Sequence, residues 1–197
     1  MATYHALTFT HTRLVPYPWV EIGVGEVRQE IEENINFAKN IFKKLEIKGY
    51  FYCEDVSHGI SLKNSSVDWV WSCGLLEHFS DEEIVDILKE SVRVCKKGVM
   101  SLVPNANSIF YRIGKFKMEQ EGTWPYGWEV PKFSMKKYFE IVGLNKIREY
   151  SVAPYHSILF WIQVEKEIKS FYNSISKEEL EKLNQGYLLF TYGEKNK

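Results

Sequence analysis

Cysteine is scarce in this sequence of 197 residues, and the cysteines present are not arranged for a disulfide framework or a zinc site. Cys53, Cys73 and Cys95 are odd in number and far apart, and no C-x-x-C pair occurs. We therefore expect three reduced thiols in a cytoplasmic protein that holds no metal ion.

Long apolar runs and an excess of charge are missing as well. No stretch approaches the roughly 18 apolar residues of a membrane-spanning helix, and the first residues lack the basic start and continuous apolar core of a signal peptide. The 25 basic residues nearly balance the 26 acidic ones, so nothing favours a polyanionic partner. We expect neither a membrane nor a nucleic acid as partner.

The sequence does contain a regular alternation of short apolar runs with helical patterns. Because such strands pair in parallel through right-handed crossovers, we expect one α/β domain over residues 1–197. Its sheet should be doubly wound (Rossmann-like), mostly parallel and flanked by helices, with an antiparallel C-terminal strand at its edge. The predicted strands are 50–56, 66–74, 98–105, 144–152 and 186–194, and the predicted helices begin near Ile31, at the capping boxes S-D-E-E (80–83) and S-K-E-E (176–179), and within 132–143 and 157–175.

Residues 106–130 are the exception to this alternation, and we expect an irregular segment there. It carries many aromatic side chains among glycines and prolines. Long loops of this kind are more often functional than idle, so the segment is predicted to bind a ligand or to act as a lid.

The residues that close each strand form the candidate site, because ligands of an open parallel sheet bind beyond the carboxyl ends of its strands. The segment E-I-G-V-G closes one predicted strand with the carboxylate of Glu21 and with Gly23 and Gly25, which allow close backbone approach. The segments C-E-D-V (53–56) and S-C-G-L-L-E-H-F (72–79) close two more.

In this order, these segments resemble the class I S-adenosylmethionine-dependent methyltransferases, particularly those with a type 11 domain, from about Asn34 to Val152. The resemblance implies S-adenosyl-L-methionine as cofactor. It implies that Asp55 and the backbone amide of Val56 lie near the adenine, and that the backbone around Ser72 and Cys73 holds the methionine part. Glu21, Gly23 and Gly25 would form the first loop of the same site.

One part of the family pattern is missing. After E-I-G-V-G the family continues through a helix to a second strand whose acidic end holds the ribose, yet here the next helix begins near Ile31. Either the first 30 residues rebuild this edge, with Glu26, Glu30 or Glu32 near the ribose, or the site is incomplete. A third alternative places Y-H-A-L-T-F-T-H-T-R-L-V in the first strand and W-V-E-I-G-V-G-E-V in the second, which removes the glycine loop.

We expect an enzyme that transfers a methyl group from S-adenosyl-L-methionine to a small acceptor held by residues 106–130. His78, which follows a strand, is the candidate catalytic residue because its imidazole can act as a base near neutral pH. The rival hypothesis is a methyltransferase-like protein that has lost cofactor binding and acts as an interaction or regulatory subunit. An exposed sheet edge left by the missing strand predicts a homodimer.

Overall fold

A computed structural model of the chain describes residues 6–10, 28–46, 49–51, 56–154, 170 and 174–196. At its centre lies a five-stranded sheet in the order β1-β2-β3-β5-β4. Strands β1 (Ala6–Thr10), β2 (Val67–Cys73) and β3 (Cys95–Pro104) are parallel, and β5 (Leu188–Glu194) is antiparallel to both β3 and β4 (Asn145–Val152). The predicted α/β class, with an open and mostly parallel sheet flanked by helices, is confirmed.

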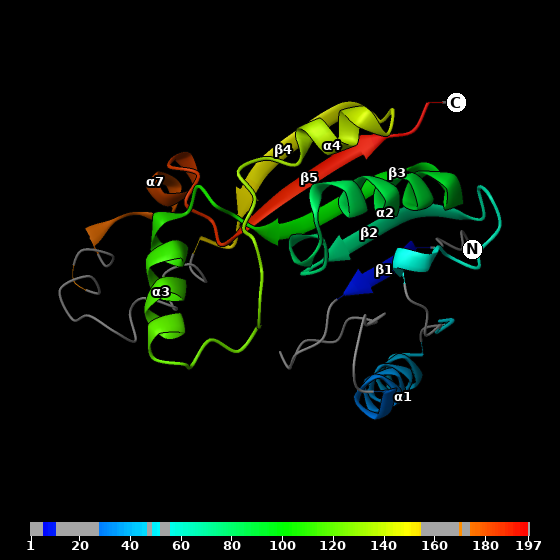
Figure 1. Cartoon of the computed structure of the whole chain (residues 1–197), viewed down its shortest axis with the longest axis horizontal. Coiled ribbons are helices and arrows are strands. Elements are labelled where there is room, and N and C mark those ends of the chain that lie inside the picture. The colour runs from blue at the N-terminus through cyan, green and yellow to red at the C-terminus, as the bar shows by residue number, and fades with distance from the viewer. Residues whose placement is uncertain are drawn as a thin grey trace.

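The C-terminal strand is antiparallel as predicted, but its predicted place at the edge is wrong. β5 lies between β3 and β4 and pairs with both, so β4 forms that edge of the sheet. Leu189, Thr191 and Gly193 alternate as buried positions along β5, so one face of this strand packs against the core. Figure 1 shows the arrowheads of β2, β3 and β4 at one end of the sheet and that of β5 at the other.

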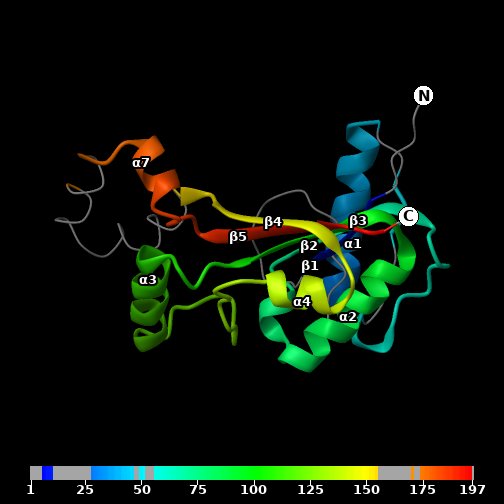
Figure 2. The same ribbon diagram turned by 90° about the horizontal axis from the view of Figure 1, so that it is seen from above.

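Two helices pack on one face of the sheet, α2 (Asp81–Val94) and α4 (Lys136–Ile141), as Figures 1 and 2 show. The predicted capping box opens α2, because Ser80 Oγ accepts from the Glu83 amide at 3.3 Å and Glu83 Oε2 accepts from the Ser80 amide at 2.8 Å. Buried Ile84, Ile87 and Leu88 then face the core, as their spacing predicts.

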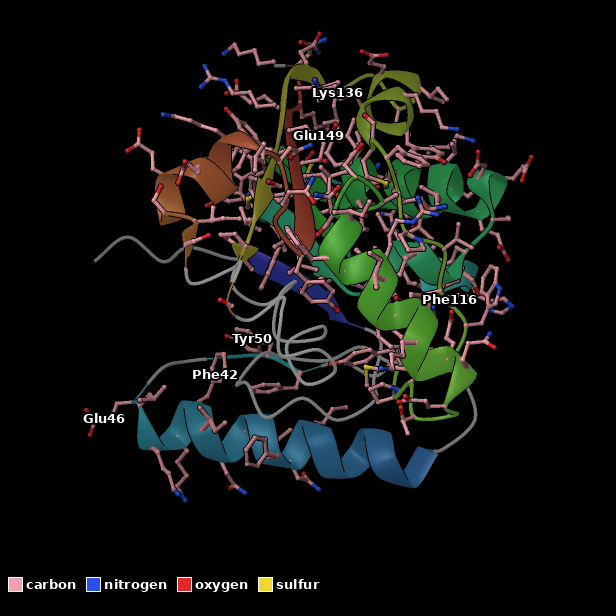
Figure 3. The ribbon with its side chains drawn as sticks, turned by 90° about the vertical axis from the view of Figure 1, so that its left-hand side faces the viewer. Phe42, Glu46, Tyr50, Phe116, Lys136 and Glu149 are labelled. Atoms are coloured by element: carbon pink, nitrogen blue, oxygen red, sulfur yellow. The ribbon has the colours of Figure 1, made fainter. Side chains whose placement is uncertain are left out.

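Helix α1 (Arg28–Lys44) begins three residues before the predicted start at Ile31 and lies beyond the β1 edge of the sheet (Figures 1 and 3). Phe42 projects from it toward the segment that carries Tyr50 (Figure 3), and the Phe42 and Phe51 rings meet edge to face at 5.2 Å. Among the described residues no strand pairs with the outer edge of β1.

The strand predicted at 50–56 is wrong in its described part. Tyr50 and Phe51 lie in no strand, and Val56 begins the 3-10 helix η1 (Val56–His58). Arg93 of α2 fixes the chain that follows, since its guanidinium donates to the carbonyls of Ile60 at 2.7 Å and Leu62 at 2.8 Å. The apolar residues Val56 and Ile60 of this segment are therefore buried in the core with residues of α2 and β2, and they do not form a strand.

The irregular segment predicted at 106–130 is also partly wrong, because it contains the helix α3 (Ile109–Gln120). Ser108 caps this helix by accepting from the Tyr111 amide at 3.5 Å, and buried Gly114 lies within it. Near the C-terminus, α7 (Lys177–Lys182) begins at the second predicted capping box, where Ser176 Oγ and Glu179 Oε2 are 2.7 Å apart. The helix predicted at 157–175 lies almost wholly outside the described residues.

Candidate functional site

The carboxyl ends of β2 and β3 meet at one edge of the sheet, where Gly74 turns the chain away. Its amide donates to the Leu102 carbonyl at 3.0 Å, and its φ of +64° is one that a residue with a side chain adopts at a cost. The turn leads into the 3-10 helix η2 (Leu76–His78). In an open parallel sheet this edge is where ligands bind, and Figure 1 shows α3 beyond it.

Cys73, the last residue of β2, is a thiol rather than a thiolate. Burial, with a smaller effect from the charge of Glu77, raises its pKa to about 12. Ser72 beside it is also buried, with 6% of its surface exposed. Since the thiolate is the nucleophilic form, this shift disfavours reaction at Cys73, and the backbone of Ser72 and Cys73 is what this edge offers a ligand.

Glu77 points into the protein from η2 and is 2% exposed. Burial raises the pKa of its carboxyl to about 8; its own backbone amide and Lys132 act to lower the pKa, whereas the nearby Glu129 raises it. Within the described residues, Oε2 of Glu77 has no hydrogen-bond partner. A buried carboxylate oxygen without a partner is costly, so this carboxyl group marks a site with a binding role.

A second buried acid, Glu129, reaches the same place from the segment after α3. Tyr111 of α3 donates a hydrogen bond to its Oε1, and burial raises the pKa of the Glu129 carboxyl. The Tyr111 ring lies 6.2 Å from that of Trp124 and 5.1 Å from that of Tyr187, so aromatic side chains border the acid pair.

Backbone hydrogen bonds hold the segment that carries Glu129 against the ends of both strands. The amide of Val130 donates to the Glu77 carbonyl at 2.9 Å, and the amide of Lys132 donates to the Pro104 carbonyl at 2.9 Å. At the end of β3, buried Asn105 donates from Nδ2 to the Asn184 and Gly186 carbonyls at 3.1 and 3.0 Å. Asn105 therefore joins the ends of β3 and β5 and is structural.

His78, the predicted catalytic residue, lies beside these two acids. Its Nδ1 donates to the Trp128 carbonyl at 2.6 Å, because a carbonyl can only accept, and its Nε2 lies 3.9 Å from Oε1 of Glu77. One ligand atom from each of Glu77, His78 and Glu129 lies within 4.8 Å of the others. The structure thus joins His78 to Glu77 and Glu129, which lie in the predicted segments 72–79 and 106–130 but were not themselves predicted as site residues.

Comparison with known proteins begins with a family model described as a methyltransferase domain, which matches residues 31–98. Phosphoethanolamine N-methyltransferase 3 of Arabidopsis thaliana is 28% identical over 131 residues, covering 60% of this chain and 26% of that protein. The chain therefore spans about a quarter of the length of this relative.

Solved structures agree with the family model at the level of the fold. A S-adenosylmethionine-dependent methyltransferase of Thermotoga maritima, described as a possible histamine N-methyltransferase, has a TM-score of 0.55 at 13% identity, covering 90% of this chain and 72% of that one. Phosphoethanolamine N-methyltransferase 2 of Haemonchus contortus, in complex with phosphomonomethylethanolamine and S-adenosylhomocysteine, has a TM-score of 0.54 at 14% identity, covering all of this chain and 50% of that one. Residues 31–98 thus match a methyltransferase domain, and the fold of the chain is similar to that of S-adenosylmethionine-dependent methyltransferases. The resemblance expected from the motifs is confirmed.

Only part of the expected methyltransferase motif can be located. Ser72, Cys73 and His78 lie together at the carboxyl edge, whereas the side chain of Val56 is buried in the core at 2% exposure. Glu21, Gly23, Gly25 and Asp55 lie outside the described residues and stay predictions. The methyltransferase family model also begins at residue 31, after the two glycines of the first predicted loop.

The strand next to β2 comes from residues 6–10, in the stretch that one sequence alternative assigned to the first strand. That alternative moves E-I-G-V-G out of the first strand. Residues 19–27, which that alternative assigns to the second strand, lie outside the described residues, so this part of the alternative stays a prediction.

Proposed function

We propose that this protein transfers a methyl group from S-adenosyl-L-methionine to a small-molecule acceptor at the carboxyl edge of β1, β2 and β3. The observation that carries the proposal is the turn at Gly74, which leaves the backbone of Ser72 and Cys73 at the strand end where the resemblance expects the methionine part of the cofactor. Support also comes from relatives that are methyltransferases and from the Haemonchus contortus enzyme, whose structure contains S-adenosylhomocysteine.

The exposed backbone at the end of β2 supports this proposal for the cofactor. When bound, S-adenosyl-L-methionine supplies a methyl group activated on a sulfonium. The acceptor is proposed to bind under residues 106–130, whose aromatic side chains Tyr111 and Trp124 border the edge, and this segment excludes water. Positioning does most of the work in such an in-line displacement, so a dedicated base is optional. We assign His78 to accept the proton that the acceptor loses, with Nδ1 held by the Trp128 carbonyl.

The test is isothermal titration calorimetry with S-adenosylmethionine and S-adenosylhomocysteine. We expect micromolar binding that Asp55→Ala weakens by at least about tenfold, since a carboxylate that bonds the ligand contributes about 1.4 kcal/mol or more. Asp86→Ala, at an exposed position of α2, is the matched control and should bind as the unchanged protein does. Equal affinity for both variants would contradict the assignment of Asp55.

The acceptor needs a separate assay with radiolabelled methyl donor. Phosphoethanolamine belongs in the first panel because two relatives carry that substrate in their names, together with other small amines, phenols and thiols. A labelled product identifies the acceptor class.

One observation favours the rival function, that of a methyltransferase-like interaction subunit. Among the described strands none lies outside β1, where the family pattern expects the strand whose acidic end holds the ribose. No heat and no thermal shift with either ligand at millimolar concentration would favour this rival and exclude the enzyme.

A further inference from the structure

We propose that Glu77, His78 and Glu129 bind a divalent transition-metal ion, through one oxygen of each carboxylate and Nε2 of the imidazole. The three ligand atoms lie within 4.8 Å of one another, although the residues come from η2 and from the segment after α3. The sequence predicted no metal site because its cysteine spacing offers none. This inference goes beyond methyl transfer and does not depend on it.

The distances between the three ligand atoms are somewhat longer than in an occupied metal site, and small side-chain movements would shorten them. In a tetrahedral zinc site, bonds of about 2 Å place the ligand atoms roughly 3.3 Å apart. Side-chain rotations that move these atoms by about 1 Å would therefore bring the three groups into coordination. The Val130 amide bonded to the Glu77 carbonyl at 2.9 Å already fixes the two backbone segments beside each other.

The orientation of His78 is the second argument. Metal-ligating histidines characteristically donate their other ring N–H to a carbonyl or carboxylate, which fixes the tautomer. His78 does so, because its Nδ1 donates to the Trp128 carbonyl at 2.6 Å. In that neutral tautomer Nε2 carries a lone pair, and it lies 3.9 Å from Oε1 of Glu77, which is also an electron-pair donor.

The third argument is the unsatisfied oxygen of Glu77. Glu77 is 2% exposed, and among the described residues its Oε2 has no hydrogen-bond partner. Glu129 is 7% exposed and receives the Tyr111 hydroxyl on Oε1. Burial raises the pKa of both carboxyl groups, so without an ion they are stabilised by protonation. A divalent ion that displaces these protons would give Oε2 of Glu77 the partner it lacks in the described ranges.

Two lysines near the cluster are engaged elsewhere. Lys132, whose charge acts on Glu77, has its Nζ 3.8 Å from Oδ1 of Asp81. Lys115, whose charge acts on Glu129, is paired with Glu119 and has its Nζ 4.7 Å from the centre of the Trp124 ring. In the described part of the chain no salt bridge joins either lysine to Glu77 or Glu129, so neither ammonium group takes the place of the ion.

The ligand set indicates the class of ion and its coordination. One imidazole with two carboxylates suits Zn²⁺, Co²⁺ or Mn²⁺ better than Mg²⁺ or a thiolate-seeking ion. Three protein ligands leave a fourth position for water or a bound small molecule, as in zinc sites that are not purely structural. Coordination by Nε2 and proton transfer at Nε2 exclude each other, so in the metal-bound protein His78 is a ligand.

The experiment titrates Zn²⁺ and Co²⁺ into the whole chain after treatment with chelator, by calorimetry and by visible absorption. We expect one ion per chain with micromolar or tighter affinity. Glu77→Gln, His78→Ala and Glu129→Gln should each weaken binding by more than about 100-fold, since partners that merely orient a ligand already change affinity by roughly 10- to 100-fold. Asp86→Asn, at an exposed position of α2, is the control and should leave the affinity unchanged.

Three outcomes would overturn the proposal: no binding, binding that all variants share, or Co²⁺ spectra with thiolate charge-transfer bands, since this ligand set contains no sulfur. The spectra are measured on the unchanged protein, so the test stands even where a variant folds poorly. Because the metal titration contains no methyl donor, its failure is distinct from failure of cofactor binding.

Discussion

At the scale of single residues, Asp81 connects the first turns of two helices. Its Oδ1 accepts from the Tyr138 hydroxyl of α4 at 2.6 Å, and its Oδ2 accepts from Lys137 Nζ at 2.9 Å. The hydrogen bond from Tyr138, followed by that from Lys137, holds the pKa of Asp81 below its ordinary value of 3.8. Ionised Asp81 therefore stabilises the folded state.

We predict that Asp81→Asn lowers the free energy of unfolding at pH 7 and has a smaller effect near pH 3. Since the folded pKa lies below the unfolded one, the stabilisation is complete above the unfolded pKa and is lost as pH falls through the folded pKa. Asp81 is 54% exposed, so the loss should stay below about 1 kcal/mol. Urea unfolding at both pH values measures it, with Asp86→Asn as control. A loss of equal size at both values would contradict the electrostatic explanation.

Single residues also show where prediction of the site stops. His78 was identifiable because it follows a strand in an open parallel sheet, and strand ends are what sequence patterns locate. Glu129 was not, since its approach to Glu77 depends on α3 and on the hydrogen bond between the Val130 amide and the Glu77 carbonyl. Contacts between residues so far apart in the chain are tertiary, and periodicity carries no signal for them.

At the scale of elements, the sequence predicted the start of a helix correctly where the hydrogen bonds that stabilise this start lie within the motif itself. The two capping boxes, at Ser80 and Ser176, start helices as predicted because their hydrogen bonds close within four residues. Helix α3 was missed because Gly114 and many aromatic residues lower its helical propensity. Its Ser108 hydroxyl donates to the Gln185 carbonyl at 2.9 Å, so packing against the chain before β5 supports it.

Close approach of β3 to β5 yields another prediction at this scale. A Cβ at Gly98 would lie 2.3 Å from the Gly193 carbonyl oxygen and 2.6 Å from the Trp69 ring, so Gly98→Ala forces the strands apart. We expect a loss of about 1–3 kcal/mol in the free energy of unfolding, measured by denaturant titration. Lys96→Ala, at an exposed position of the same strand, should change stability by less than about 0.5 kcal/mol. If Gly98→Ala and Lys96→Ala lower the free energy of unfolding equally, the close contact at Gly98 does not limit the side chain at this position.

At the scale of the whole molecule, the two edges of the sheet differ. The β4 edge carries Lys146 and Arg148 in exposed positions, and charged side chains discourage pairing between sheets. The β1 edge pairs with no strand among the described residues. Among the described helices, none is both long and apolar enough to cross a membrane.

From the β1 edge we predict a homodimer, which buries it against a second copy of the chain. Size-exclusion chromatography with light scattering, over a series of micromolar concentrations, should give twice the mass of one chain. A single-chain mass at every concentration would remove the prediction and leave β1 covered by the chain itself.

The insertion of β5 between β3 and β4 has a consequence for how the protein is made. The ribosome releases β4 before β5, yet among the described strands β4 pairs with β5 alone. A nascent chain that has reached Val152 therefore carries a finished β2–β3 pair and an unpaired strand with both edges open. Strand β4 can join the sheet only after residues 188–194 have been made, and until then it is a site for misassembly that a chaperone would have to cover.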